Sequence, residues 1–196
     1  MRHGDSRQDV VRRFIGRTDF SLNERGKKEA DFWRQKLSSI PFGRVCSSSL
    51  ARSIETARII FRDRPLSIEA LPALDEINLG QWDGLPVDEV RRRSPLEYER
   101  RGADFAGYRI DGGESFSDVG ARVLPVFEAI TKGIDENVLI VGHAGVNRVI
   151  LCHLLGVPLN NLFSLGQDYC CLNIIERFGD VVLLRGMNIP PSFFNR

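Results

Sequence analysis

One short apolar segment constrains the fold of this chain more than any other part of its sequence. Residues Asn137–Val141 read N-V-L-I-V, a continuous apolar run, and Gly142 and His143 follow directly. Continuous runs of this kind are typical of parallel strands that are covered on both faces. A helix is expected next, at about Val146–Leu155, so this part of the chain predicts a strand and a helix of an α/β sheet.

The rest of the chain alternates short apolar runs with longer amphipathic ones. Asn23 is expected to cap a helix from about Glu24 to Ser39, and Ser49 to cap a second helix. The other expected elements are strands at Arg44–Ser47, Leu66–Ala70, Cys170–Glu176 and Val181–Arg185, a helix at about Ser115–Lys132, and a hairpin turn at Phe178-Gly179-Asp180. Strands that alternate with helices predict an α/β fold with a largely parallel sheet and an antiparallel edge.

Residues 86–113 differ from the rest of the chain in composition. They are polar, basic and lightly aromatic, with Arg91, Arg92, Arg93, Arg100, Arg101, Arg109, Tyr98 and Tyr108. This composition is typical of a surface excursion. The length of 196 residues suits one domain, so we expect a single domain over residues 1–196 with an insertion at about 86–113.

Charge and cysteine content exclude several classes of protein. The 27 Lys+Arg against 26 Asp+Glu give a formal net charge of +1, which argues against a broad nucleic-acid surface. No apolar run approaches the roughly 18–20 residues of a membrane span, and no secretory leader is recognised. We therefore expect a cytoplasmic monomer or homodimer without nucleic-acid or membrane partners. The four cysteines form no C-x-x-C pair and are expected to be buried free thiols.

Polar residues stand where several expected strands end. His3 lies in Arg2-His3-Gly4, Arg52 and Glu76 each follow an expected strand, and His143 follows the N-V-L-I-V strand. In open α/β sheets, ligands bind outside the carboxyl ends of the strands, where a helix N-terminus favours an anion. Arginine forks recognise phosphate, and an imidazole nucleophile needs one unprotonated nitrogen. Each residue alone is more often structural, as we expect of His153, but their joint placement indicates a phosphate site.

Six short motifs occur along the chain in a fixed order. They are R-H-G at residues 2–4, G-R-T-D-F-S-L at 16–22, S-S-S-L-A-R-S-I-E-T-A at 47–57, L-D-E with G-Q-W-D-G at 74–84, G-G-E-S at 112–115 and V-G-H-A-G at 141–145. As an ordered set they resemble the motifs of the histidine phosphatase superfamily over nearly the whole chain. The expected C-terminal hairpin is similar to the strand pair of the α-ribazole phosphatases, one group of that superfamily.

The resemblance implies a fold and a reaction. The fold is the phosphoglycerate-mutase-like, three-layer α/β/α sandwich, with a mostly parallel sheet and one antiparallel edge strand. His3 would attack phosphorus to form a phosphohistidine that water then hydrolyses, and Glu76 would act as general acid and then general base. The implied function is hydrolysis of a small phosphomonoester without metal or other cofactor. A phosphoglycerate mutase and a catalytically silent, phosphate-binding regulatory module are the alternatives.

The resemblance also assigns the residues around the phosphoryl group. Guanidinium and imidazole groups would stabilise its non-bridging oxygens, and backbone N–H groups at a helix start would add donors. The implied substrate-binding residues are Arg2, Arg52, His143, Gly16 and Ala144. The insertion at 86–113 would be a cap over this pocket, and its arginines and tyrosines indicate an anionic or ring-bearing substrate.

Two positions depart from the pattern of the superfamily. Asp9 stands where many members have an asparagine, and its carboxylate would repel phosphate unless Arg12 or Arg13 neutralises it. Only Met1 precedes Arg2, where members have a central strand of several apolar residues. Loss of that strand would leave backbone groups of its neighbours unpaired, so we expect Met1 to be an internal residue of a longer chain or a mis-assigned start.

Overall fold

A computed structural model describes residues 1–179 and 181–195 of the chain. The strands are β1 (Arg44–Ser47), β2 (Ile68–Ala70), β3 (Val138–Val141), β4 (Leu172–Phe178) and β5 (Val181–Ile189). A parallel sheet has the order β2-β1-β3, and β4 and β5 form a separate antiparallel pair. The α/β class and the parallel sheet are confirmed. The antiparallel pairing that the sequence predicts at the edge of this sheet occurs instead in the separate two-stranded sheet of β4 and β5.

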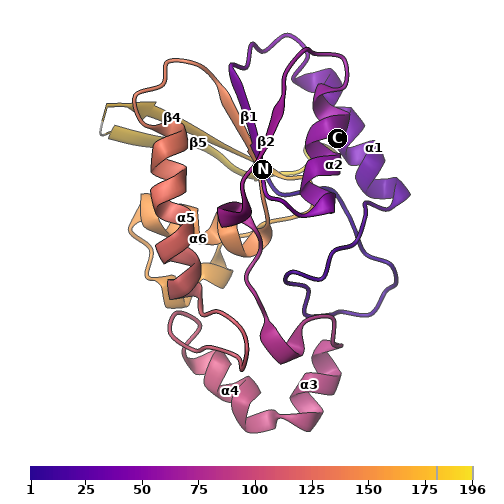
Figure 1. Cartoon of the computed structure of the whole chain (residues 1–196), viewed down its shortest axis with the longest axis vertical. Helices are drawn as coiled ribbons and strands as arrows, with labels where there is room; N and C mark the ends of the chain where they lie inside the picture. The colour runs from indigo at the N-terminus through magenta and orange to yellow at the C-terminus, as the bar shows by residue number, and fades with distance from the viewer. Residues whose placement is uncertain (180, 196) are drawn as a thin grey trace.

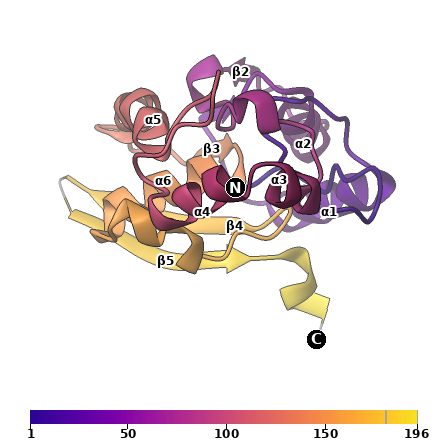
Figure 2. The same cartoon turned by 90° about the horizontal axis from the view of Figure 1, so that it is seen from below.

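The described residues form six α-helices, four of which cover the two faces of the parallel sheet. The six are α1 (Glu24–Lys36), α2 (Ala51–Phe61), α3 (Val87–Arg93), α4 (Pro95–Ala103), α5 (Phe116–Thr131) and α6 (Ala144–Leu155), with short 3-10 helices at Pro72–Leu74, Gly80–Trp82, Leu159–Ser164 and Pro191–Asn195. Figures 1 and 2 show α1 and α2 on one face and α5 and α6 on the other. This arrangement is the predicted three-layer sandwich.

Successive side chains of each strand point to opposite faces of the sheet and so contribute to two separate parts of the core. In β1, Val45 packs into the cluster formed by α1 and α2, whereas Cys46 packs into the cluster formed by α5 and α6. In β3, Leu139 belongs to the first cluster and Ile140 to the second. Successive strand residues point to opposite faces, so these short apolar segments need helices on both sides. All four cysteines are buried and free, as predicted.

The register of the parallel sheet aligns the ends of its strands. Ser47 of β1 pairs with Ala70 of β2 on one side and with Val141 of β3 on the other. The residues that follow these three positions therefore leave the sheet at one level. The site residues of the sequence come from these connections, so the register brings them to one edge.

The N-terminal residues run beside β3. Arg2 forms a parallel bridge with Gly142, and the His3 N–H donates to the Gly142 carbonyl oxygen at 3.0 Å. On its other side, the Arg2 N–H donates to the carbonyl oxygen of Cys171 at 3.1 Å. This segment thus joins the parallel sheet to the chain before β4 and places Arg2 and His3 at the carboxyl edge. A strand before Met1 stays a prediction.

Capping explains where the predicted helices begin. Asn23 caps α1 by accepting from the Gly26 N–H at 2.9 Å, and Ser115 caps α5 in a capping box with Asp118. The prediction that Ser49 caps the second helix is wrong, because its N–H and hydroxyl donate to the Asp75 carboxylate instead. That helix begins at Ala51 without a side-chain cap.

Several predicted boundaries shift. The first helix ends at Lys36, before the expected Ser39, and the helix after His143 begins two residues early. The strand expected from Cys170 begins at Leu172, because Cys170 has a φ of 53°. The last strand extends to Ile189. Asp180 of the expected turn lies outside the described residues.

Residues 86–113 contain α3 and α4. None of the residues of α4 is buried, which fits the predicted surface character. Figure 1 shows both helices at the far end of the molecule from the strands. Tyr98 of α4 stacks at 6.4 Å on Trp82, whose ring lies 5.3 Å from Phe14. No helix within the described residues is long and apolar enough to cross a membrane.

Candidate active site

Two histidines meet at the carboxyl edge of the sheet. The ring centroids of His3 and His143 lie 5.1 Å apart, although the residues come from opposite ends of the chain. Both are buried. His3 follows the N-terminal segment, and His143 is the residue before α6. The pairing of the N-terminal segment with Gly142 is what sets the two rings side by side.

The protonation state of His3 follows from its hydrogen bond. Its Nδ1 lies 2.8 Å from the Gly4 carbonyl oxygen. A carbonyl oxygen only accepts, so Nδ1 carries the proton and Nε2 keeps a free lone pair. Burial, followed by the positive charges of Arg2 and Arg52, holds the pKa of His3 well below its usual 6.5. The ring is therefore neutral at pH 7, as a nitrogen nucleophile must be.

Glycine is required beside this histidine. A Cβ on Gly4 would lie 2.7 Å from the carbonyl oxygen of Gly26 in α1. The Gly4 N–H donates to the hydroxyl of Thr56 in α2 at 3.0 Å. The R-H-G motif therefore fits between the first two helices only because its third residue lacks a side chain.

Three buried nitrogens near His3 have no hydrogen-bond partner in the protein. Among the described residues, the buried side-chain nitrogens and oxygens without a partner are Nε of Arg2, Nε of Arg52 and Nδ1 of His143. An unpaired buried donor costs about 1–3 kcal/mol. All three belong to residues that the sequence predicts to bind phosphate. The guanidinium N–H groups suit an oxyanion, and Nδ1 of His143 can donate to one when it carries the proton of the neutral ring and Nε2 accepts from the Ser48 hydroxyl.

The other polar atoms of these residues are fixed by the protein. Arg52 is only 1% exposed and donates to the carbonyl oxygens of Gly16 and Thr18 at 2.6 and 2.8 Å. Arg2 donates from Nη1 to the Gln167 carbonyl oxygen at 2.6 Å. Nε2 of His143 lies 2.7 Å from the Ser48 hydroxyl oxygen. Each side chain is thus held by at least one hydrogen bond and keeps one buried nitrogen without a partner.

The side chain of Glu76 contacts the first turn of α6. Its two carboxylate oxygens accept from the N–H groups of Ile77 at 2.9 Å and Gly145 at 3.0 Å. A Cβ on Gly145 would lie 2.4 Å from Oε1 of Glu76, so this position also requires glycine. The negative charge of Glu76 opposes the lowering of the pKa of Arg52 by burial, so this carboxyl group acts on one of the residues that the sequence predicts to bind phosphate.

An ion pair holds the segment that carries Glu76. Arg122 of α5 donates to both carboxylate oxygens of Glu114 at 2.8 and 3.0 Å. The same guanidinium donates to the carbonyl oxygens of Ala73 at 2.7 Å and Glu76 at 3.2 Å. Glu114 also accepts from the Asn78 N–H at 2.8 Å. This network fixes the backbone on both sides of Glu76.

Gly16 and Ala144, the other two predicted binding residues, are next to residues of the site. Gly16 accepts from Arg52 and donates from its N–H to Asp83 at 2.8 Å. Ala144 is the first residue of α6, directly after His143. Contact of either with substrate stays a prediction. Asp9 is exposed and paired with Arg13 at 3.0 Å, so Arg13 is the residue that neutralises it. His153 is exposed on α6.

Sequence reasoning missed several residues around the site. The guanidinium carbon of Arg2 lies 3.7 Å from the ring centroid of Tyr169, and the His3 ring lies 5.7 Å from the same ring. Tyr169 and Arg122 stand in no motif, so no sequence signal pointed to them. Ser48 and Glu114 do stand in motifs, but their roles depend on partners far along the chain.

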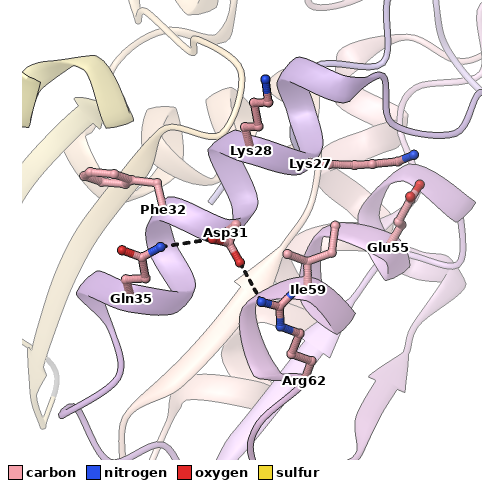
Figure 3. Close-up of a pocket in the computed structure, with 8 residues that line it drawn as sticks. All are labelled: Lys27, Lys28, Asp31, Phe32, Gln35, Glu55, Ile59 and Arg62. Carbon is pink, nitrogen blue, oxygen red and sulfur yellow. Dashed lines mark hydrogen bonds and ion pairs between the residues drawn. The ribbon is translucent and has the colours of Figure 1, made fainter.

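Two surface grooves lie near α1. One, of about 680 Å³, adjoins the site through Arg2 and is also lined by Arg7, Arg25, Lys28 and Tyr169, among others. The other, of about 580 Å³, lies between α1 and α2. Figure 3 shows the residues that line it, among which Asp31 accepts a hydrogen bond from Gln35 and forms an ion pair with Arg62. None of the predicted catalytic residues lines this second groove.

Comparisons with known proteins identify a family and similar folds. A family model described as the histidine phosphatase superfamily (branch 1) matches residues 1–190. Phosphoserine phosphatase 1 of Hydrogenobacter thermophilus is 33% identical over 177 residues, which cover 90% of this chain and 84% of that protein. The α-ribazole phosphatase structure from Shigella flexneri has a TM-score of 0.88 at 25% identity, covering 96% and 94% of the two chains. A mycobacterial glucosyl-3-phosphoglycerate phosphatase, solved with VO3, has a TM-score of 0.84 at 26% identity over 96% of each chain.

Proposed function

This chain belongs to the histidine phosphatase superfamily, and from that premise we propose that it hydrolyses small phosphomonoesters through a phosphohistidine at His3. The observation that carries the proposal is the set of three buried, unpaired nitrogens of Arg2, Arg52 and His143 beside a neutral imidazole. Among the described residues, every other buried side-chain nitrogen or oxygen has a hydrogen-bond partner, so these three nitrogens suit a ligand with several oxygens.

The first half of the reaction transfers the phosphoryl group to the protein. Nε2 of His3 attacks phosphorus with its lone pair, and the bond between phosphorus and the leaving oxygen breaks. Nδ1 keeps its proton and continues to donate it in a hydrogen bond to the Gly4 carbonyl oxygen. Glu76, in its protonated form, gives its proton to the leaving oxygen. The donors of Arg2, Arg52 and His143 stabilise the charge on the three non-bridging oxygens.

The second half returns the protein to its starting state. Glu76, now a carboxylate, takes a proton from a water molecule that attacks the phosphohistidine. The bond between phosphorus and Nε2 breaks, and inorganic phosphate leaves. One difficult displacement is thereby divided into two easier ones. The positive charge comes from side chains, so the proposed reaction uses no metal.

The substrate class is a small phosphomonoester. The similar proteins are named as phosphatases of phosphoserine, α-ribazole phosphate and glucosyl-3-phosphoglycerate, and these names differ in the leaving group. We propose that the phosphoryl group is recognised at His3 and that residues 86–113, as a cap, recognise the rest of the substrate.

Hydrolysis of p-nitrophenyl phosphate in the presence of EDTA tests this function. We expect turnover by the unmodified protein and by His153→Ala, whose histidine is exposed on α6, and none by His3→Ala. Transfer between 3-phosphoglycerate and its bisphosphate, in place of hydrolysis, would indicate the mutase. Phosphate binding without turnover of any ester would indicate the silent regulatory module.

A further inference from the structure

The guanidinium of Arg2 is held by a single hydrogen bond. In the part of the chain that the structure describes, this bond runs from Nη1 to the main-chain carbonyl oxygen of Gln167 at 2.6 Å. Arg52, by contrast, donates to two carbonyl oxygens. The Tyr169 ring, whose centroid lies 3.7 Å from the guanidinium carbon of Arg2, attracts the cation but does not fix its orientation. The direction of Nε therefore depends on where the carbonyl group of Gln167 lies.

Gln167 lies in a loop and is fixed there by its own side chain. It follows the 3-10 helix Leu159–Ser164 and precedes β4. The residue is only 5% exposed, and Nε2 of its amide donates to the carbonyl oxygen of Gly166 at 2.7 Å, so the side chain folds back on its own loop. Glutamine is mostly exposed in proteins, so a buried amide with satisfied hydrogen bonds specifies one conformation of the loop.

Asn173 of β4 forms a reciprocal pair with this amide. Nε2 of Gln167 donates to Oδ1 of Asn173, and Nδ2 of Asn173 donates to Oε1 of Gln167, both at 3.0 Å. Two hydrogen bonds between planar amide groups fix their orientation as well as their distance. Oδ1 of Asn173 also accepts from the N–H of Asn188 in β5 at 2.9 Å. The loop is thereby attached to both strands of the antiparallel sheet.

Asn147 connects the same amide to the other side of the site. Its Nδ2 donates to Oε1 of Gln167 at 3.0 Å. Asn147 is 6% exposed and lies in α6, and its N–H donates to the carbonyl oxygen of His143 at 2.9 Å. Two of the three nitrogens without a partner, Nε of Arg2 and Nδ1 of His143, are thus held in one hydrogen-bonded network whose centre is the amide of Gln167.

We propose that Gln167 is a positioning residue, whose buried amide fixes the carbonyl oxygen that holds Arg2 and thereby directs Nε of Arg2 toward the phosphoryl group. The proposal rests on the proposed function, because that function gives Arg2 its ligand. Gln167 acts through Arg2 and is assigned no contact with substrate. A displacement of about 1 Å can cost about 100-fold in rate, so a loop without this amide would weaken a contact that every phosphomonoester makes.

A double-mutant cycle between Gln167 and Arg2 tests this assignment. Gln167→Met keeps the length of the side chain and removes its hydrogen bonds, and Arg2→Ala removes the guanidinium. Calorimetry measures the affinity of the unmodified protein, both single variants and the double variant for tungstate, a tetrahedral oxyanion that resembles phosphate. Asn173→Ala removes only the reciprocal pair, and it takes the place of Gln167→Met in the cycle if that variant does not fold.

We expect Gln167→Met to lower the affinity for tungstate about tenfold, the effect of one charged hydrogen bond. In the Arg2→Ala background the same change should lower it by less than about twofold. The value of kcat/KM should fall about 10- to 100-fold, by the same factor for aryl and alkyl phosphates, because Arg2 is assigned to the non-bridging oxygens. A residue that acted through Glu76 would instead slow the poor leaving groups most.

Two control variants separate positioning from a general loss of stability. Gln35→Met makes the same substitution on the exposed side of α1, where the amide donates to Asp31. Ile130→Val removes one buried methyl group from α5, in the core. Both controls should bind tungstate as the unmodified protein does, and Ile130→Val should do so although its unfolding temperature is lower.

Two results would overturn the assignment of Gln167. One is an equal loss of tungstate affinity in both backgrounds, because Gln167 would then act without Arg2. The other is a folded Gln167→Met variant with the affinity of the unmodified protein. Hydrolysis of p-nitrophenyl phosphate by the same preparations tests the phosphatase proposal separately: tungstate binding without turnover contradicts that proposal, and the cycle still decides the role of Gln167. Absence of tungstate binding by the unmodified protein would contradict both.

Discussion

Substitution of Arg52 by lysine keeps a positive charge at the site but removes the donor that we assign to the phosphoryl group. In the protein as it stands, Nη1 and Nη2 of Arg52 are held by the carbonyl oxygens of Thr18 and Gly16, and Nε has no partner. A lysine ammonium places all its donors at one point. It can replace the contacts with the carbonyl oxygens or the contact with phosphate, but not both.

The size of the effect follows from the geometry. Loss of one preorganised oxyanion donor costs about 2.7–4 kcal/mol, or roughly 100- to 1000-fold in kcat. The contact tightens as charge develops in the transition state, so kcat and kcat/KM should fall together. A ligand present at 100 times its dissociation constant stabilises a protein by about 2.7 kcal/mol. A hundredfold weaker affinity would reduce this to about 0.4 kcal/mol.

Steady-state kinetics with p-nitrophenyl phosphate and thermal unfolding with and without vanadate measure both effects. Arg58→Lys is the matched control, because Arg58 is exposed on the same helix. We expect the control to behave as the unmodified protein does in both assays. A folded Arg52→Lys variant that keeps kcat within about threefold of the unmodified protein, far less than the loss of an oxyanion donor, would refute the assignment of Nε.

Three further predictions concern the groups around this donor. Glu76→Gln should slow hydrolysis of alkyl phosphates, which need a proton on the leaving oxygen, far more than that of activated aryl phosphates; equal losses on both would contradict the acid role. His3 and His143 have pKa values lowered by burial, so their stabilising contribution is present above the unfolded value of 6.5 and is lost as pH falls below it. Urea unfolding should show the free energy of unfolding falling by up to about 2.7 kcal/mol per pH unit below 6.5, and by about half that in His143→Ala; an unchanged slope in the variant would contradict the burial of neutral rings. Arg122→Gln should lower kcat about 10- to 100-fold through misplacement of Glu76, with the greatest loss on poor leaving groups, and a loss that is uniform across leaving groups would limit Arg122 to a structural role.

The sequence predicts the core of the site because the relevant residues follow strands. Parallel strands that end in register bring their following residues to one edge, so Arg52 and His143 could be placed together without coordinates. His3 was added through the R-H-G motif and the resemblance that it supports. The helix starts at Asn23 and Ser115 were predictable for a similar reason, since a cap bonds to residues only a few positions away.

Other features depend on contacts between distant segments. The sequence predicts that Ser49 caps the second helix, but its hydroxyl donates to the carboxylate of Asp75. A partner 26 positions along the chain is not indicated by helix-capping rules, which concern neighbouring residues. Arg122 lies in the middle of a helix, and only the packing of α5 brings it to Glu76.

The central claim, that His3 carries the phosphoryl group, can be tested by trapping. The protein is mixed with a labelled phosphomonoester, quenched under alkaline conditions within one turnover, digested and analysed by mass spectrometry. We predict a phosphoryl group on the peptide that contains His3, absent from His3→Ala and retained in His153→Ala. A phosphoryl group on any other residue, or turnover by His3→Ala at the rate of the unmodified protein, would contradict the account.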